Sequence, residues 1–379
     1  MLASFGLAMG SAFPAARLLS GRRTRAVVVA LAAFAAVPAR AAEFYAGKTL
    51  NFVINFTAGG PTDLEGRLAA KYLARHIAGS PNVVVRNMAG AGGAIGVNWL
   101  GEIAQPDGTN VGFFTSLASS AAIAAPSIRV DTSKFVFVAG GPGVSIAYAR
   151  TDIAPGLKTP ADIMKAKDFW VGGLGPDSDK DLRIRLQLDM LGLKYHYISN
   201  YPGSNEARLA IVQNEIQVFP ESMPTYRATI EPMVAAGQVI PLWHDALDDG
   251  ENFSASPDAA GIPAPTFTDF LKQQKGGFPS GIEWEVFKTI NSAGTVFLRS
   301  VAMPPGTPKE ASDALRAAFA AVTKDEEFKA EASKILKFTP RYLVDDKTEA
   351  LYREKLRPNP QVAAFMKDYI EKGRASLGK

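Results

Sequence analysis

Two glycine-rich loops, each following a short apolar run, constrain this chain more than any other feature. One follows the run at 50–54 and reads Phe56-Thr57-Ala58-Gly59-Gly60-Pro61-Thr62-Asp63; the other follows the run at 83–85 and reads Ala89-Gly90-Ala91-Gly92-Gly93-Ala94-Ile95-Gly96. Glycine lets backbone N–H groups approach a ligand without a Cβ in between. A loop of free N–H groups that leads into a helix N-terminus binds anions. Two such loops on neighbouring strands predict a site for one carboxylate without any cationic side chain.

The length and the pattern of the chain indicate a two-domain α/β protein. Its 379 residues are more than a single hydrophobic core ordinarily accommodates. Short β-rich runs alternate with helical patterns, which favours layers with mostly parallel sheets. Strands are predicted at 49–55, 82–86, 110–115, 135–138, 145–149, 169–171, 195–197, 216–219, 239–243 and 296–300. Helices are predicted at 62–78, 93–103, 161–167, 179–191, 205–213, 222–236, 308–323, 325–335 and 348–356, and a loop at 248–265.

The basic charge of the chain lies in its first 41 residues. They hold five arginines and no acid, and removing these five from the 41 basic residues leaves 36 against 37 acidic ones. The charge is therefore no argument for a nucleic-acid partner. Arg22-Arg23-Thr24-Arg25, the apolar run at 26–37 and Ala39-Arg40-Ala41 have the order of a secretory signal with its cleavage site. We expect residues 1–41 to be a signal peptide and the mature protein to be soluble in the periplasm.

Several chemistries are disfavoured by what the motifs lack. The chain has no cysteine, which excludes disulfides, thiolate metal sites and a cysteine nucleophile. The second glycine loop has the spacing G-x-G-G-x-x-G instead of the dinucleotide fingerprint. The three histidines, His76, His196 and His244, show no metal spacing, and no G-x-S-x-G elbow is present. We therefore predict no cofactor, no metal and no catalytic residues.

The acidic segment Asp177-Ser178-Asp179-Lys180-Asp181 allows two interpretations. It alternates acids as a calcium loop does, but Leu182 and Leu188 stand where that loop needs a glycine and its last acid. A helix N-terminus whose acids complement the helix dipole is the favoured interpretation.

Several motifs occur together in an order that resembles one known family. The first loop continues from Asn55, the second begins at Asn87, and Pro106-Asp107-Gly108 precedes the strand at 111–115. Further on come Tyr201-Pro202-Gly203-Ser204-Asn205-Glu206-Ala207, Pro263-Ala264-Pro265-Thr266-Phe267 and Pro304-Pro305-Gly306-Thr307-Pro308-Lys309-Glu310. The chain from about residue 43 onward resembles the TctC/Bug family, the periplasmic solute-binding proteins of tripartite tricarboxylate transporters.

The resemblance implies a fold with two α/β lobes, of the type II-like periplasmic-binding-protein kind, that close by a hinge on a ligand cleft. The expected lobe 1 is discontinuous and consists of residues 42–142 and 262–379, and lobe 2 is 143–261. The implied first-lobe ligand-binding residues are Phe56, Thr57, Ala58, Gly59, Gly60, Thr62, Asp63, Ala91, Gly92, Gly93, Thr115 and Ser116. The implied second-lobe residues are Ser178, Tyr201, Gly203, Ser204 and Glu221.

The chain departs from the family pattern at two places. Pro61 replaces a frequent glycine and removes one N–H donor. Asp177, Asp179 and Asp181 replace a commonly neutral segment, and acids near a cleft repel a second carboxylate. One hypothesis is therefore a ligand whose distal end is neutral, aromatic or cationic; the alternative is that these acids point to solvent.

The function that follows is capture of a small carboxylate, without catalysis, and its delivery to the membrane permease subunits of a tripartite transporter. We expect a monomer. A periplasmic ligand sensor for a signalling partner is the alternative function, and a periplasmic hydrolase using the same cleft is a weaker one.

Overall fold

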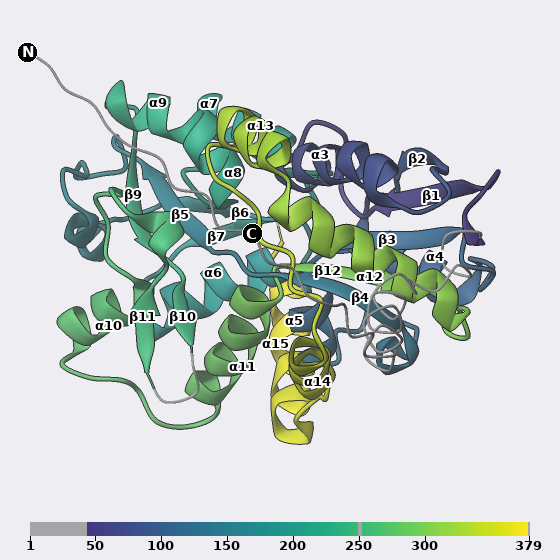
Figure 1. Cartoon of the computed structure of the whole chain (residues 1–379). Coiled ribbons are helices and arrows are strands. Elements are labelled where there is room, and N and C mark those ends of the chain that lie inside the picture. Colours follow the sequence, from purple (N-terminus) through teal and green to yellow (C-terminus); the bar gives the residue numbers. More distant parts are fainter. Residues whose placement is uncertain (1–43, 249–251, 378–379) are drawn as a thin grey trace, which may run out of the picture. The chain divides into compact units, whose positions relative to one another are not determined.

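The strands form two five-stranded sheets and one hairpin in the computed structural model, which describes residues 44–248 and 252–377 (Figure 1). The predicted signal peptide lies outside the described residues. The first sheet has the order β2 (Asn82–Asn87), β1 (Thr49–Ile54), β3 (Asn110–Thr115), β12 (Arg299–Met303), β4 (Val136–Gly141). The second has the order β7 (His196–Ile198), β6 (Trp170–Gly172), β8 (Val218–Ser222), β5 (Ser145–Arg150), β9 (Val239–His244). The hairpin pairs β10 (Ala246–Asp248) with β11 (Phe253–Ala255).

Both sheets are mixed, so the prediction of mostly parallel sheets was wrong. In the first sheet β1 is parallel to β2 and β3, but β12 is antiparallel to β3 and β4. In the second sheet β6 is parallel to β7 and β8, but β5 is antiparallel to β8 and β9. The chain enters β5 directly from β4 of the first sheet, and it enters β12 after the last strand of the second sheet. Neither strand is joined to a neighbour in its own sheet by a crossover helix, and both run antiparallel to their neighbours.

The described helices have the following bounds. The α-helices are α3 (Pro61–His76), α4 (Ala94–Glu102), α5 (Leu117–Ala122), α6 (Asp179–Met190), α7 (Ser204–Val212), α8 (Met223–Thr225), α9 (Glu231–Ala235), α10 (Phe267–Lys275), α11 (Ile282–Val296), α12 (Lys309–Lys324), α13 (Glu326–Leu336), α14 (Asp346–Lys355) and α15 (Pro360–Ser376). The short turns are η1 (Ala91–Gly93), η2 (Thr132–Lys134), η3 (Pro160–Lys165), η4 (Tyr226–Ile230) and η5 (Pro257–Ala259). None of these helices is long and apolar enough to span a membrane.

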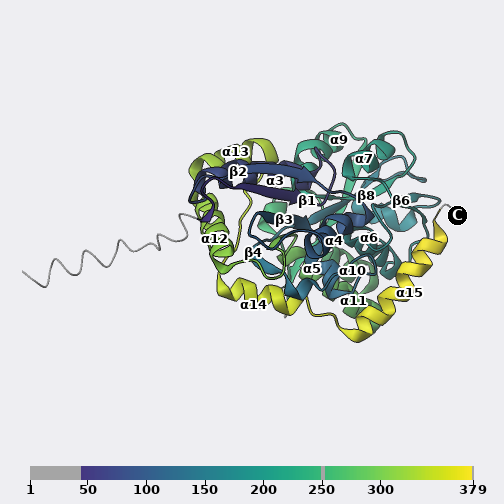
Figure 2. The ribbon, with the colours of Figure 1, turned by 90° about the vertical axis from the view of Figure 1, so that its right-hand side faces the viewer.

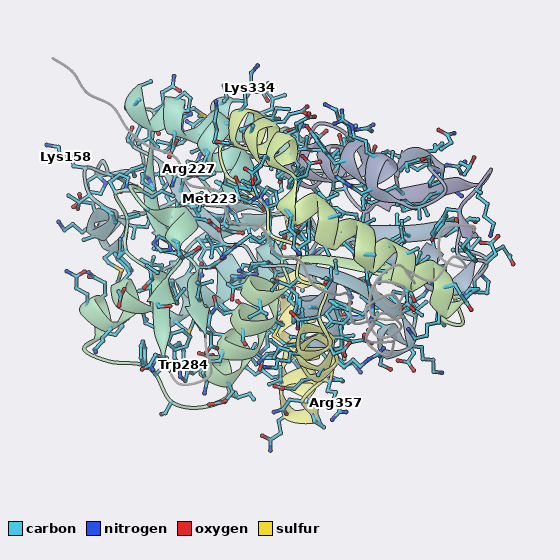
Figure 3. All side chains as sticks on the ribbon, in the orientation of Figure 1. Lys158, Met223, Arg227, Trp284, Lys334 and Arg357 are labelled. Carbon is cyan, nitrogen blue, oxygen red and sulfur yellow. The ribbon has the colours of Figure 1, made fainter. Side chains whose placement is uncertain are left out.

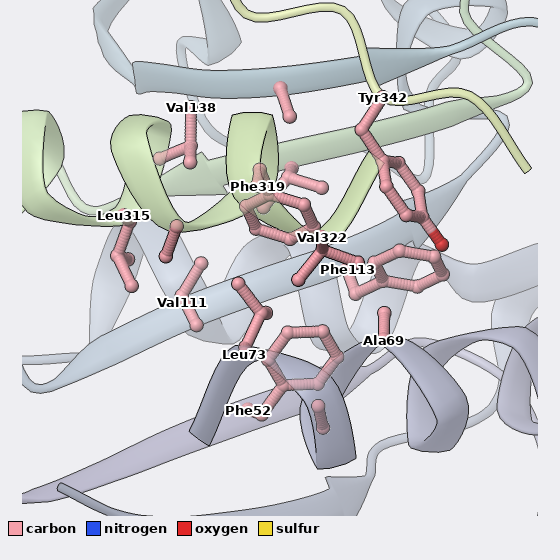
Figure 4. Packing of buried hydrophobic residues seen from close by; sticks show 14 of the residues in the cluster. Phe52, Ala69, Leu73, Val111, Phe113, Val138, Leu315, Phe319, Val322 and Tyr342 are labelled. Atoms are coloured by element: carbon pink, nitrogen blue, oxygen red, sulfur yellow. The ribbon is translucent and has the colours of Figure 1, made fainter. Parts of the chain in front are cut away.

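The core of the first sheet forms where α3 and α12 pack on its strands (Figure 4). Phe52 and Phe113 stack at 5.5 Å between ring centroids, and Phe319 of α12 meets Tyr342 edge-on. Helix α3 begins with a proline in its first turn, where the missing N–H costs no hydrogen bond, and with Asp63, which complements the helix dipole. This packing holds the loop between β1 and α3 at the carboxyl end of the strand.

The core of the second sheet also includes residues far along the chain. Phe267 and Phe270 of α10 and Phe287 of α11 pack with Trp243 of β9. Trp284 of α11, labelled in Figure 3, lies with its ring centroid 5.6 Å from that of Phe253 in the hairpin. Helix α15, in yellow in Figure 2, packs on α11 and contacts β7. The chain passes from β4 to β5 at residues 142–144, and the lobe boundaries at 142 and 262 stay a prediction.

The predicted elements differ from the structure mainly after residue 220. The helix predicted at 222–236 is a run of α8, the π turn η4 and α9. The strand predicted at 296–300 begins only at Arg299, because α11 continues to Val296. Helices α5, α10, α11 and α15 were not predicted, and strand β11 of the hairpin lies within the stretch predicted as a loop.

Candidate functional site

A small cavity lies where loops of the two sheets meet. The space in it that is open to the centre of a water molecule has a volume of about 10 Å³. One wall consists of Phe56, Thr57, Gly60, Pro61, Thr62 and Thr115, and the other of Leu174, Lys180, Ser204 and Ser222. This is room for about one water molecule, so a ligand enters only when the two walls move apart.

The first wall presents the N-terminus of α3 to the cavity. Its N-cap residue, Gly60, has no side chain to satisfy the first turn, and Pro61 carries no N–H. The N–H groups of Thr62 and Asp63 have no acceptor within the helix because they belong to its first turn. These groups and the positive end of the helix dipole favour an anion at this position.

A buried network fixes this wall from behind. The hydroxyl groups of Thr62 and Thr115 share a 2.7 Å hydrogen bond, and Arg299 Nη1 donates to Thr115 Oγ1 at 2.8 Å. Arg299 Nε also donates to Glu65 Oε2 at 2.8 Å. Burial raises the pKa of Glu65 and Arg299 opposes the rise. The network therefore holds the first turn of α3 against the end of β3.

Asp63 organises the first glycine loop instead of facing the cavity. Its carboxylate accepts hydrogen bonds from the Gly59 N–H at 2.8 Å, from Asn87 Nδ2 at 2.8 Å and from Arg67 Nε at 2.9 Å. The Gly59 N–H group is thereby committed to Asp63. The loop conformation depends on this carboxylate, while the ligand donors come from the turn that follows.

The second wall contains a buried cation, Lys180, near the start of α6. Its ammonium donates to Ser204 Oγ at 2.8 Å and to Glu221 Oε1 at 3.1 Å. Glu221 is fully buried and also accepts from Arg208 Nη1 at 3.1 Å. Burial lowers the pKa of Lys180, and Glu221 opposes that shift. The second wall therefore contributes a cationic side chain that was not predicted, and binding of one carboxylate by the two glycine loops alone stays a prediction.

The three acids around Lys180 do not line the cavity. Asp181 accepts from Leu174 N at 2.6 Å and from the hydroxyl groups of Ser178, Tyr197 and Ser199. Asp179 pairs with Arg183, and Asp177 accepts from Ser127 N at 3.1 Å. Ser178 caps α6, with Asp179 and Asp181 in its first turn, which confirms the helix-start interpretation. All three carboxylates are buried, so neither the premise of the ligand-repulsion hypothesis nor the alternative of acids in solvent holds.

Loops of the two sheets touch directly around the cavity. The Thr57 hydroxyl oxygen fills the space where a Cβ on Gly203 would lie, and a Cβ on Gly92 would lie 2.6 Å from Ser178 Cβ. Asn205 Nδ2 donates to the Ala58 carbonyl at 3.5 Å. Glycines at these positions permit the close approach that encloses the cavity.

The structure brings only some of the predicted ligand-binding residues to the cavity. Those that line it are Phe56, Thr57, Gly60, Thr62, Thr115 and Ser204. Residues at the contacts between loops are Ala58, Gly59, Gly92, Ser178 and Gly203. Those in supporting positions are Asp63, Ala91, Gly93, Ser116, Tyr201 and Glu221. The lining residues Pro61, Leu174, Lys180 and Ser222 were not among the predicted ligand-binding residues. For Lys180 the sequence offered only its position two residues after a helix cap as a signal.

The described residues contain no group of three or more histidine, aspartate or glutamate side chains arranged to hold a metal ion. Two of the histidines have structural surroundings. His76 Nε2 pairs with Asp325 at 2.7 Å, and His244 is buried with Nδ1 near the Asp245 carbonyl.

Comparison with known proteins shows which of them are similar to this chain in sequence or in fold. No family model matches the chain. A UPF0065 protein of Agrobacterium vitis is 27% identical over 189 residues, 48% of this chain, and the match spans about half of that relative (52%). The periplasmic binding protein BugD has a TM-score of 0.63 at 20% identity, over 87% of this chain and 99% of that one.

Two further solved structures carry ligands. MatC from Rhodopseudomonas palustris, with bound malate, has a TM-score of 0.58 at 18% identity, over 87% of this chain and 99% of that one. An R. palustris protein with adipate has a TM-score of 0.61 at 18% identity, over 86% and 98%. The chain has a periplasmic-binding-protein fold, as predicted. Its structural neighbours are Bug and TctC solute-binding proteins.

Proposed function

We propose that this chain is a periplasmic solute-binding protein of the Bug and TctC type, which captures a small carboxylate and does not catalyse a reaction on it. The observation that supports this most is the small cavity that both the uncapped N-terminus of α3 and the buried ammonium of Lys180 line. Both groups favour an anion. Neighbours of the same fold hold malate and adipate.

The proposal includes the route of the ligand. The protein acts after export as a soluble monomer, and the lobe built on the first sheet closes against the lobe built on the second sheet around the ligand. The closed form presents both lobes to the permease subunits of a tripartite tricarboxylate-type transporter. Closure requires that the ligand bind the closed state better than the open one.

Thermal unfolding of the protein purified after expression of the full chain tests ligand capture. The panel contains short mono- and dicarboxylates, aromatic acids and amino acids of matched size. A ligand at a hundred times its Kd stabilises the native state by about 2.7 kcal/mol. We expect a rise in Tm with one or more carboxylates. A Tm that no carboxylate changes would contradict the proposal.

Delivery to a transporter is tested separately in cells. Uptake of the radiolabelled carboxylate that gives the largest rise in Tm is compared between cells that carry the gene and cells that lack it. We expect uptake to depend on the gene. Equal uptake in both, with ligand capture intact, would assign the chain to sensing instead of transport.

A further inference from the structure

We propose that Asp177 is a latch between the two lobes: its carboxylate stabilises the closed form without lining the cavity, and so raises the affinity for the ligand. Asp177 accepts a hydrogen bond from the Ser127 N–H at 3.1 Å. The first lobe is the one built on the first sheet, and the second lobe the one built on the second sheet. The inference rests on the proposed function, because it concerns the opening and closing of the same cavity.

Ser127 is fastened to the first lobe by Asn98 of α4. Asn98 Nδ2 donates to the Ser127 carbonyl at 2.8 Å, and the Arg129 N–H donates to Asn98 Oδ1 at 2.9 Å. Val97 and Leu100 of the same helix are buried in the core that α4 forms with the first sheet. The segment that carries Ser127 therefore moves with the first lobe.

Asp177 is fastened to the second lobe by the carboxylate of Asp181. This carboxylate accepts from the Gly175 N–H, just before Asp177, at 3.3 Å and from the Ser178 hydroxyl, just after it, at 2.5 Å. The Tyr197 hydroxyl of β7 donates to the same carboxylate. Both neighbours of Asp177 are thus tied to a strand of the second sheet, and Asp177 moves with the second lobe.

The hydrogen bond between Ser127 and Asp177 therefore joins two parts of the molecule that must separate. A ligand enters the cavity only when its walls move apart, and Leu174, which lines the second wall, lies shortly before Asp177. Ile123 and Ala125 also pack on α6 near the latch, but apolar contacts are non-directional and allow sliding. A hydrogen bond depends on distance and angle, so opening breaks this one.

The surroundings of Asp177 make this hydrogen bond the main part of the latch. The Asp177 side chain is 4% exposed, so its carboxylate depends on the partners that the closed form provides. Arg374 Nη2 of α15 lies 3.5 Å away, but that side chain is 40% exposed and also pairs with Glu371, and such ion pairs contribute little. Because the apparent affinity falls with the fraction of closed protein, an interaction made only in the closed form raises that affinity.

Pulsed electron paramagnetic resonance between two spin labels measures the closed and open populations. The chain has no cysteine, so Lys158→Cys in the second lobe and Lys334→Cys in the first are the only labelled sites. Both lysines are exposed and are labelled in Figure 3. A hydrogen bond to a charged group changes an equilibrium by about 10- to 150-fold, so we expect the ratio of closed to open protein, measured without ligand, to fall by that factor in Asp177→Ala.

Two further variants separate the role of the hydrogen bond from that of the fold. Asp177→Asn keeps the shape and one acceptor oxygen without the charge, and should give an intermediate ratio. The exposed acid Asp368 of α15 supplies the control Asp368→Ala, which should keep the wild-type ratio. In titration calorimetry with the carboxylate that raises Tm most, Kd should increase from the control to Asp177→Asn and again to Asp177→Ala.

The outcomes distinguish the latch from the proposed function. An unchanged ratio of closed to open protein in Asp177→Ala would show that the bond persists on opening, and would overturn the inference while carboxylate capture stays intact. An equal fall in Asp368→Ala would overturn it as well, because the loss of any acid would then suffice. Binding of no carboxylate by the wild type would contradict the proposed function, and the label distances would still test the latch.

Discussion

The Thr57 hydroxyl oxygen occupies the space that a side chain on Gly203 would need. Gly203 has φ −165°, an extended conformation that any residue adopts, so an alanine there brings no backbone strain. The two residues come from loops of different sheets. Their contact therefore limits how closely the loops of the two sheets approach each other around the cavity.

Gly203→Ala should weaken carboxylate binding because its methyl group holds the two loops apart. Overpacking costs typically 1–3 kcal/mol, which corresponds to an increase in Kd of roughly 5- to 150-fold. The measurement is titration calorimetry with the best carboxylate. Thr57→Ala/Gly203→Ala removes the nearest atom and should recover most of the loss, while Glu206 Oε2 still lies 3.0 Å from the added methyl group. Unchanged binding by Gly203→Ala would show that this contact plays no part in closure.

Arg299→Met should destabilise the protein strongly. Arg299 and Glu65 are both buried and bound at 2.8 Å, so removing the arginine leaves a buried carboxylate without its cation. Breaking such a pair costs about 3–5 kcal/mol. Urea unfolding measures the loss. Arg299→Met/Glu65→Gln removes both charges and should recover a large part of it; a double variant as unstable as the single one would assign the loss to packing of the arginine.

Asp325→Ala should destabilise the protein at pH 7 by about 1 kcal/mol, because Asp325 caps α13. It accepts from Glu327 N at 2.8 Å and pairs with His76 at 2.7 Å. The hydrogen bond with His76 lowers the pKa of Asp325 below its ordinary 3.8. The lowered pKa means that this stability is present above pH 3.8 and is lost as pH falls through the folded-state value.

Urea unfolding of the wild type and Asp325→Ala at several pH values checks this. The difference in unfolding free energy should shrink below pH 3.8. Asp325→Asn, which keeps the cap acceptor without the charge, should fall between the two at pH 7. A difference that stays constant down to pH 2 would contradict the role of the ionised carboxylate.

The parts of the fold that local pattern determines were predicted well. Strand β3 has its predicted bounds and β1 ends one residue earlier than predicted, because apolar runs bounded by turn residues identify such strands. Helix α15 was missed because its apolar positions are explained only by packing against α6 and α11. The antiparallel β12 depends on where a distant segment returns, which no local pattern records.

The candidate site likewise has parts that could be predicted from local sequence and parts that could not. The glycine loops were found because their residues are contiguous. Lys180 was missed because a lysine between two aspartates resembles a solvated helix start. Its burial depends on Ser204 and Glu221, which lie 24 and 41 residues further along the chain. The positions of the acids, which turn away toward Arg183, Ser127 and Tyr197, are likewise a tertiary property.

The most direct test of the proposed function is a crystal structure of the protein with the carboxylate that raises its Tm most. We predict the ligand inside the cavity, with one carboxylate within about 3.2 Å of the Thr62 or Asp63 N–H. A ligand bound in a surface groove, with the cavity between the two sheets unoccupied, would contradict the assignment of this cavity as the carboxylate site.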